Sequence, residues 1–164
     1  MSIRTHRGVD LFAKYPHYRL VVPRPIIPPK GYPVESQTLG EHLRKRRLDL
    51  GLLQIEVAAM IGVSENTVWN WEHGTESELK HIPAIIAFLG YVLWECPRDT
   101  LGRLAHFKKI KGLFFQRLGP LMGRDPKQLS DWLSGRNAPI EKNRRKIPTF
   151  LDDYDEEGTE ERKG

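Results

Sequence analysis

Apolar residues recur at helical spacing on both sides of a short break at residues 62–64. Gly62 adopts the left-handed backbone conformation without steric cost, and Ser64 can accept the first unpaired amide protons of a new helix. A turn this short brings two helices into close contact, so small residues are expected there, and Ala58 and Ala59 are small. The pattern predicts two short helices whose core-facing residues are Val57, Ala58, Ile61, Val68 and Trp71.

Two further helices are predicted around this pair. Thr38 and Glu41 have the spacing of a capping box, which predicts a helix that runs to about Leu50. Pro83 suits the first turn of a helix that ends at Gly90, and its residues Ile82, Ile85, Ile86 and Leu89 are expected to be buried. Four helices within about 55 residues predict a compact all-α bundle over residues 35–93.

A shifted copy of the same pattern follows. At a shift of 61 residues Ser64 falls on Asp125, and the other matched pairs are Gly62 and Gly123, Val68 and Leu129, Trp71 and Trp132, and Gly74 and Gly135. Thr100-Leu101-Gly102 repeats Thr38-Leu39-Gly40 at a shift of 62, so the copy is expected to lack one residue between Gln116 and Gly119. Pro120 is expected to interrupt a helix, and Leu133 replaces the acid at Glu72. We expect a second, diverged domain over residues 98–151.

The two ends of the chain differ in composition from the middle. Residues 1–34 hold six of the twelve prolines, with six Lys or Arg against Asp10, which predicts an irregular Pro-rich basic arm. That arm is expected to be disordered or loosely packed, and the alternatives are that it lies along a polyanion or docks on the folded body. Residues 152–164 carry seven acids against two bases, a net charge of −5, and are expected to form a disordered acidic tail. Residues 1–151 are therefore +10, which favours a polyanionic partner, although a solvated surface has the same balance.

Composition gives little support to other functional classes. One cysteine, Cys96, excludes a disulfide framework, and no apolar run reaches the roughly 18 residues of a membrane span. The six histidines have no metal-ligand spacing, and no Gly-rich phosphate loop or nucleophile motif occurs. We expect a cytoplasmic protein that is not an enzyme and has no metal, cofactor or evident small-molecule ligand.

The run TLGEHLRKRRLDLGLLQIEVAAMIGVSENTVWNWEHG, from Thr38 to Gly74, resembles the phage repressor and Cro class of helix-turn-helix proteins, the XRE family. The resemblance extends to about Tyr91. It implies a lambda-repressor-like fold whose second motif helix, near Ser64–His73, enters the major groove of double-stranded DNA. With the shifted copy, it implies two tandem helix-turn-helix bundles.

Several side chains are candidates for contact with DNA. The exposed side of the second motif helix is expected to read bases, with Asn66 pairing with adenine and Glu65 accepting from cytosine. The candidate base contacts are Glu65, Asn66, Trp69 and Asn70. The resemblance directs Gln54 toward a phosphate, and the candidate phosphate contacts are Gln54, Arg44, Lys45, Arg47 and Ser64. In the second copy the candidates are Arg124, Lys127, Gln128 and Ser130, with a further cluster at Lys142, Arg144, Arg145 and Lys146. Asp131 would repel a phosphate.

Two functions remain open from the sequence. The first is a sequence-specific transcriptional regulator, in particular a repressor, associated with the nucleoid. Its two units would read two half-sites, or one unit would form a homodimer. The second is a protein-interaction module, such as an antitoxin-like or assembly partner, that uses the second copy and the acidic tail.

Overall fold

The computed structural model describes residues 31–160, with side chains described as far as Tyr154. Most of the expected Pro-rich arm, residues 1–30, lies outside this range. Every regular element among the described residues is a helix, which confirms the all-α class. The chain divides into two compact units between Leu93 and Trp94. We call them unit 1 and unit 2.

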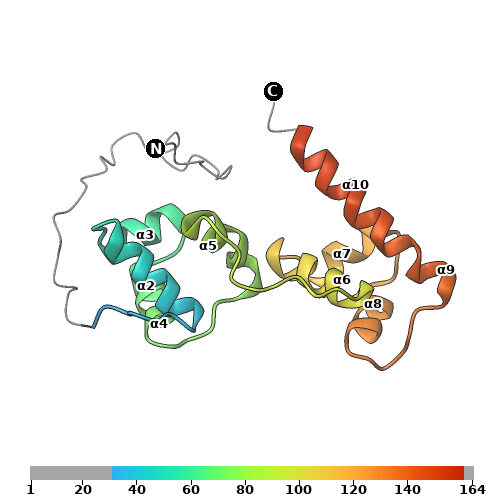
Figure 1. Cartoon of the computed structure of the whole chain (residues 1–164), viewed down its shortest axis with the longest axis horizontal. Coiled ribbons are helices and arrows are strands. Elements are labelled where there is room, and N and C mark those ends of the chain that lie inside the picture. The colour runs from blue at the N-terminus through green and yellow to red at the C-terminus, as the bar shows by residue number, and fades with distance from the viewer. Residues whose placement is uncertain (1–30, 161–164) are drawn as a thin grey trace, which may run out of the picture. The chain divides into compact units, whose positions relative to one another are not determined.

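Unit 1 contains α2 (Leu39–Asp49), α3 (Gln54–Ile61), α4 (Glu65–Glu72), the 3-10 helix η1 (Leu79–His81) and α5 (Ile82–Leu89) (Figure 1). The four predicted helices are all present. Their apolar faces meet in one core, which consists of Leu43, Val57, Ala58, Ile61, Val68, Trp71, Ile85, Phe88 and Leu89. Ile86 is only partly buried, and Phe88 occupies the core instead.

Local hydrogen bonds fix the start of α2. Thr38 Oγ1 accepts from the Glu41 amide at 3.2 Å, and the Glu41 carboxylate accepts from the Gln37 and Thr38 amides at 2.8 and 2.9 Å. Those amide donors hold the pKa of the Glu41 carboxyl below its ordinary value, with Gln37 contributing most. The predicted capping box is confirmed.

The closest approach between helices in unit 1 occurs at Gly40. A Cβ atom added there would overlap the backbone carbonyl of Trp71, so α2 and α4 touch through a glycine. Ala58 is buried at the contact of α3 with α4, whereas Ala59 is exposed. The expectation of a small residue at the turn is therefore correct for Ala58 and wrong for Ala59, because Ala59 lies on the outer face of α3.

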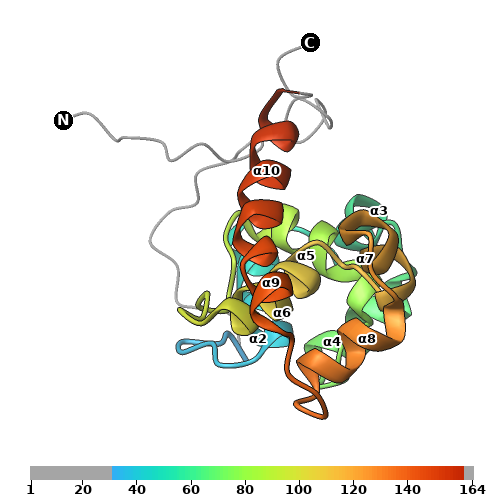
Figure 2. The ribbon, with the colours of Figure 1, turned by 90° about the vertical axis from the view of Figure 1, so that its right-hand side faces the viewer.

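Unit 2 contains α6 (Thr100–Ile110), α7 (Phe115–Met122), α8 (Pro126–Leu133), α9 (Glu141–Arg144) and α10 (Lys146–Glu160). Figure 2 shows α9 leading directly into α10. The buried core consists of Leu104, Phe107, Leu118, Leu129, Trp132, Ile147 and Leu151. Each unit thus has a hydrophobic core of its own.

The first three helices of the two units correspond at one constant offset. α2 and α6 have 11 residues each, and α3, α4, α7 and α8 have 8 each, all at an offset of 61 residues. The expected deletion between Gln116 and Gly119 is absent. The two Thr-Leu-Gly sequences are not structurally equivalent. Thr38 caps α2, whereas the cap of α6 is Asp99 and Thr100 is the first residue of the helix.

Pro120 does not interrupt α7, contrary to the prediction from sequence. A proline inside a helix loses one backbone hydrogen bond and clashes with the carbonyl four residues earlier and with the Cβ of the preceding residue. The last of these clashes is absent here, because the preceding residue is Gly119. Gly119 is also required by the fold, because an added Cβ would lie 2.7 Å from the Arg124 carbonyl oxygen.

The acidic C-terminal region departs from the expected disordered tail at residues 152–164. α10 continues through residue 152 to Glu160, and residues 161–164 lie outside the described range. Leu151 is buried, and the Tyr154 ring packs edge-on against Phe107 at 4.9 Å. Leu151 and Tyr154 are about one helical turn apart, so both face the core of unit 2. They hold α10 against that core beyond residue 152, where the disordered tail was expected to begin.

No helix among the described residues is long and apolar enough to span a membrane.

Candidate nucleic-acid interface

The α3–α4 pair of unit 1 is joined by a tight, well-satisfied turn. Gly62 has a φ of 81°, and the amides of Gly62 and Val63 both donate to the Ala58 carbonyl at 2.9 Å. Ser64 then caps α4, because its Oγ accepts from the Thr67 amide at 3.2 Å. This hydroxyl also pairs with Thr67 Oγ1 at 2.8 Å. Ser64 is exposed, but its hydroxyl already makes the hydrogen bonds of the cap. Its observed role is therefore to cap α4, and a phosphate contact would be additional.

The two sides of α4 have different roles. Val68 and Trp71 are buried at 0% and 3% exposure, as predicted. Of the four candidate base contacts, Glu65, Asn66 and Trp69 are exposed and Asn70 is partly buried. The outward surface of α4 therefore presents a carboxylate, amides and an indole, which are the kinds of groups that hydrogen-bond or pack against base edges.

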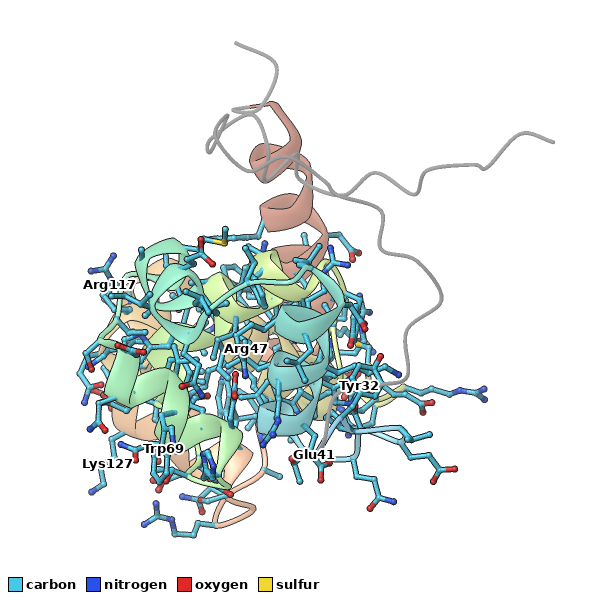
Figure 3. The ribbon with its side chains drawn as sticks, turned by 90° about the vertical axis from the view of Figure 1, so that its left-hand side faces the viewer. Tyr32, Glu41, Arg47, Trp69, Arg117 and Lys127 are labelled. Carbon is cyan, nitrogen blue, oxygen red and sulfur yellow. The ribbon has the colours of Figure 1, made fainter. Side chains whose placement is uncertain are left out.

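Trp69 is held in place by His73. The two rings are stacked with centroids 3.9 Å apart and planes 20° apart, and His73 Nδ1 lies 2.7 Å from the Trp69 carbonyl oxygen. Because a carbonyl only accepts, Nδ1 carries the proton of this bond. Trp69 remains 48% exposed, and Figure 3 shows its side chain at the surface of α4. The sequence pattern did not identify this role of His73.

A buried polar cluster connects α2, α3 and α4. Arg47 donates to both carboxylate oxygens of Glu72, from Nε at 2.6 Å and from Nη2 at 2.7 Å, and to the Leu52 carbonyl from Nη1 at 3.1 Å. Gln54 Nε2 donates to the same carboxylate at 2.9 Å. The side chains of Arg47 and Glu72 are only 12% and 1% exposed. We call Arg47, Gln54 and Glu72 the polar clamp.

The polar clamp changes the interpretation of two candidate phosphate contacts. Arg47 (labelled in Figure 3) has its guanidinium turned into unit 1 and committed to Glu72. Gln54 is fixed at the first turn of α3, where its orientation is set by Glu72. Glu72 was not identified from sequence as a functional residue, since only its burial beside an arginine 25 positions away reveals its role.

A groove lies over this clamp. It is lined by Arg44, Arg47, Leu53, Gln54, Ile55, Glu65, Trp69, Glu72 and His73. Arg44 and Arg47 are the cations of α2 on this side, and the buried Nε of Arg44 has no hydrogen-bond partner among the described residues. Lys45 is on another side of α2, with its ammonium 6.0 Å from the centre of the Tyr32 ring. The structure brings Arg44, Gln54, Glu65 and Trp69 together and leaves Lys45 apart.

The candidate residues of unit 2 surround a different groove, lined by Asp125, Lys127, Gln128, Asp131, Trp132, Asn137, Ala138, Ile140 and Asn143. Asp125 caps α8 by accepting from the Lys127 and Gln128 amides at 2.9 and 3.1 Å. Arg124 is not free to move, because its Nη2 donates to Asn143 Oδ1 at 2.7 Å. Ser130 is partly buried.

Unit 2 lacks the polar clamp. At the offset of 61 residues, Lys108, Phe115 and Leu133 occupy the positions of Arg47, Gln54 and Glu72. The Lys108 ammonium lies 4.5 Å from the centre of the Phe115 ring, and burial lowers the pKa of this ammonium. A cation over an aromatic ring thus replaces a hydrogen-bonded ion pair.

No cluster of three or more His, Cys, Asp or Glu side chains suited to a metal ion occurs in the described part of the chain.

Comparison with known proteins bears on this surface directly. Residues 43–92 match the model of a family described as "Helix-turn-helix". The matched range includes all of α3, the turn and α4, and it ends shortly after α5. Searches of curated proteins and of solved structures gave no match.

Proposed function

The chain carries a helix-turn-helix domain of the XRE family at residues 43–92, and from this premise we propose that it is a sequence-specific transcriptional regulator. In this proposal α4 enters the major groove of double-stranded DNA, as the second helix of such a motif does. The observation that carries the proposal is the outward surface of α4. It is polar and exposed, on a helix whose other side is fixed by Val68 and Trp71 in the core.

Asn66 and Glu65 are the proposed base-reading residues at the start of α4. An asparagine amide pairs with adenine through one donor and one acceptor, and a carboxylate accepts from the amino group of cytosine. Both residues are exposed and belong to the first turn of the helix, which is the part that reaches base edges. Trp69 and Asn70, one turn later, would contact the next base pairs, Trp69 through an apolar contact with a thymine methyl group.

The groove over the polar clamp is the proposed phosphate contact of unit 1. Gln54 begins α3, so its own amide and that of Ile55 have no partner within the helix and can donate to an anion. The amides of the next two residues, in contrast, donate to the Leu53 carbonyl. Arg44 lines the same groove and contributes a positive charge to it. A phosphate bound here would fix the register of α4 on the duplex without carrying sequence information.

Repression is the proposed sign of regulation. A domain that covers the major groove excludes other proteins from the same base pairs, so occupancy alone is sufficient to repress. On this proposal the protein is cytoplasmic and associated with the nucleoid. Two half-sites would be read either by a homodimer or by the two units of one chain.

The experiment is a fluorescence anisotropy titration of the full chain with a duplex selected from a random pool and with a scrambled duplex. Asn66→Ala should weaken binding to the selected duplex by roughly 1 to 3 kcal/mol and leave binding to the scrambled duplex unchanged. Gln37→Ala, which removes an exposed side-chain amide away from α4, is the matched control. It should leave the affinity for both duplexes unchanged. Equal affinity of the unaltered protein for the two duplexes would refute the proposal.

A further inference from the structure

The net charge of the chain is unevenly divided between the two units. Residues 31–93, which include the matched domain, hold five Lys or Arg against eight Asp or Glu. Residues 94–154 hold thirteen Lys or Arg against seven Asp or Glu. Residues 31–93 are thus net acidic at −3, and residues 94–154 carry a net charge of +6. Outside these ranges, residues 1–30 add six Lys or Arg against Asp10, and residues 155–164 add five acids against two bases. A domain of net charge −3 is poorly suited to attract a polyanion by itself.

Many cations of unit 2 are engaged within it. The Lys109 ammonium lies 3.6 Å from the centre of the Trp94 ring, and Lys111 lies 5.2 Å from that of Tyr154. Arg136 pairs with Asp131 at 3.2 Å, and Arg103 with Asp152 at 3.3 Å. The charge available to a partner must therefore be sought elsewhere in the unit.

Four cations gather in one short segment, residues 142–146, which we call the basic turn. Its members Lys142, Arg144, Arg145 and Lys146 are all exposed. The nearest acid in sequence, Glu141, pairs with Arg145 at 2.8 Å across a solvent-exposed gap. Lys142, Arg144 and Lys146 have no ion pair with any residue that the structure describes. Three side chains of like charge thus project into solvent from five consecutive residues.

The basic turn is rigidly attached to unit 2. Its one uncharged residue, Asn143, points inward and accepts from Arg124 at 2.7 Å, which ties the turn to the α7–α8 connection. Ile147, directly after the turn, is fully buried in the core. The charges are therefore held on a fixed surface formed by α9 and the start of α10 (Figure 2). A fixed surface loses less conformational entropy on binding than a loose chain does.

Unit 1 has the opposite charge in the corresponding connection. The segment between α4 and α5 carries Glu76 and Glu78, and its one cation, Lys80, pairs with Glu78 at 2.8 Å. The two units thus differ in the sign of the charge at the segment that follows their third helix. Of these two segments, only the one in unit 2 has the positive charge that a polyanion would contact.

The residues proposed to contact phosphate in the groove of unit 1 are replaced in unit 2. Phe115 and Leu133 stand where the polar clamp has Gln54 and Glu72, and Asp125 satisfies the first amides of α8. Asp131 adds a carboxylate to the groove beside α8. These features disfavour phosphate contact along α7 and α8, and leave the basic turn as the cationic surface of the unit.

We propose that the basic turn binds the phosphate backbone of the DNA duplex whose bases α4 reads. It adds to the sequence-independent part of the affinity, beyond the phosphate contact proposed for the groove of unit 1, because residues 31–93 are net acidic. The inference rests on the proposed function for its choice of polyanion. Backbone binding releases counterions, so it weakens as salt rises, by a slope of about 0.9 per neutralised phosphate in logarithmic units.

The test compares the salt dependence of binding to a duplex of scrambled sequence, measured by fluorescence anisotropy on the full chain. The variant Lys142→Gln/Arg144→Gln/Lys146→Gln removes three exposed charges without touching the core. If all three contact phosphates, the slope falls by about 2.7. The loss of affinity between about 50 and 200 mM salt then becomes about 40-fold smaller than for the unaltered chain.

A matched control removes three exposed charges outside the basic turn, by Lys80→Gln/Arg98→Gln/Arg117→Gln (Arg117 is labelled in Figure 3). Its slope should change by less than about 1. An unchanged slope in the basic-turn variant, or an equal change in the control, would overturn the inference. Because the duplex is scrambled, this readout does not depend on base recognition. If the unaltered chain binds the selected and scrambled duplexes equally, but the basic-turn variant still lowers the salt slope, only the proposed reading of bases by α4 is refuted.

Discussion

Removing the Glu72 carboxylate by Glu72→Leu is predicted to destabilise unit 1 severely. The Arg47 side chain is 12% exposed and directs two donors at Glu72, so the variant leaves a buried guanidinium without its counter-charge. Breaking a buried ion pair from one side costs about 3 to 5 kcal/mol. For a unit of this size, that corresponds to a fall in melting temperature of at least about 12 °C.

The measurement is urea unfolding of the full chain in a Trp132→Phe background, so that Trp71 is the buried indole that reports on unit 1. Glu78→Leu is the matched control, because the Glu78 side chain is 67% exposed in its pair with Lys80 and its loss should leave the stability of unit 1 almost unchanged. The double variant Arg47→Met/Glu72→Leu removes both charges and should recover most of the lost stability. A loss below about 1 kcal/mol for Glu72→Leu, or no recovery in the double variant, would refute this reasoning.

Three further predictions concern helix contacts and caps. Gly40→Ala should destabilise unit 1 by about 1 to 3 kcal/mol or more in thermal unfolding, because the new Cβ overlaps the Trp71 carbonyl, and a neutral result would contradict that contact. Asp125→Ala should cost unit 2 about 0.5 to 2 kcal/mol by removing the cap of α8, again by thermal unfolding. Glu41 has a lowered pKa in the folded state, so its contribution is present above the ordinary value of 4.5 and is lost as pH falls through the lower folded pKa. The difference in melting temperature between the unaltered chain and Glu41→Ala should therefore shrink on acidification below about pH 4.5, and a constant difference would contradict the cap.

The helices of unit 1 could be predicted because their ends depend on neighbours in sequence. Thr38 and Glu41 close a capping box within four residues, Gly62 ends α3 in the left-handed conformation, and Ser64 caps α4. The apolar spacing of each helix determines its buried face without reference to the rest of the chain. Gly90 likewise ends α5 with a φ of 84°.

The features that could not be predicted depend on contacts between distant residues. Arg47 is one of four consecutive cations, and only the folded unit shows that it turns inward to Glu72. The glycine contact at Gly40 requires the crossing of α2 with α4, and the extension of α10 requires the core that Leu151 joins. The constant offset of 61 residues was obscured because Thr-Leu-Gly recurs one position out of register.

The net charge of the chain could be counted from sequence, but which cations are available to a binding partner could not. Counting predicted a basic body, whereas the folded part of unit 1, residues 31–93, is net acidic and residues 94–154 of unit 2 are basic. Burial, ring contacts and ion pairs then determine which cations remain available. The four at the basic turn belonged to a cluster whose sequence pattern alone did not distinguish a binding surface from a solvated one.

Selection of bound duplexes from a random pool tests most directly whether α4 reads DNA sequence. The full chain should enrich a short common sequence. Asn66→Ala should enrich the same sequence with the preference relaxed at one base pair, because only the contact of that amide is lost. If the unaltered chain enriches no common sequence, or if Asn66→Ala enriches an identical one, reading of bases by Asn66 on α4 is contradicted.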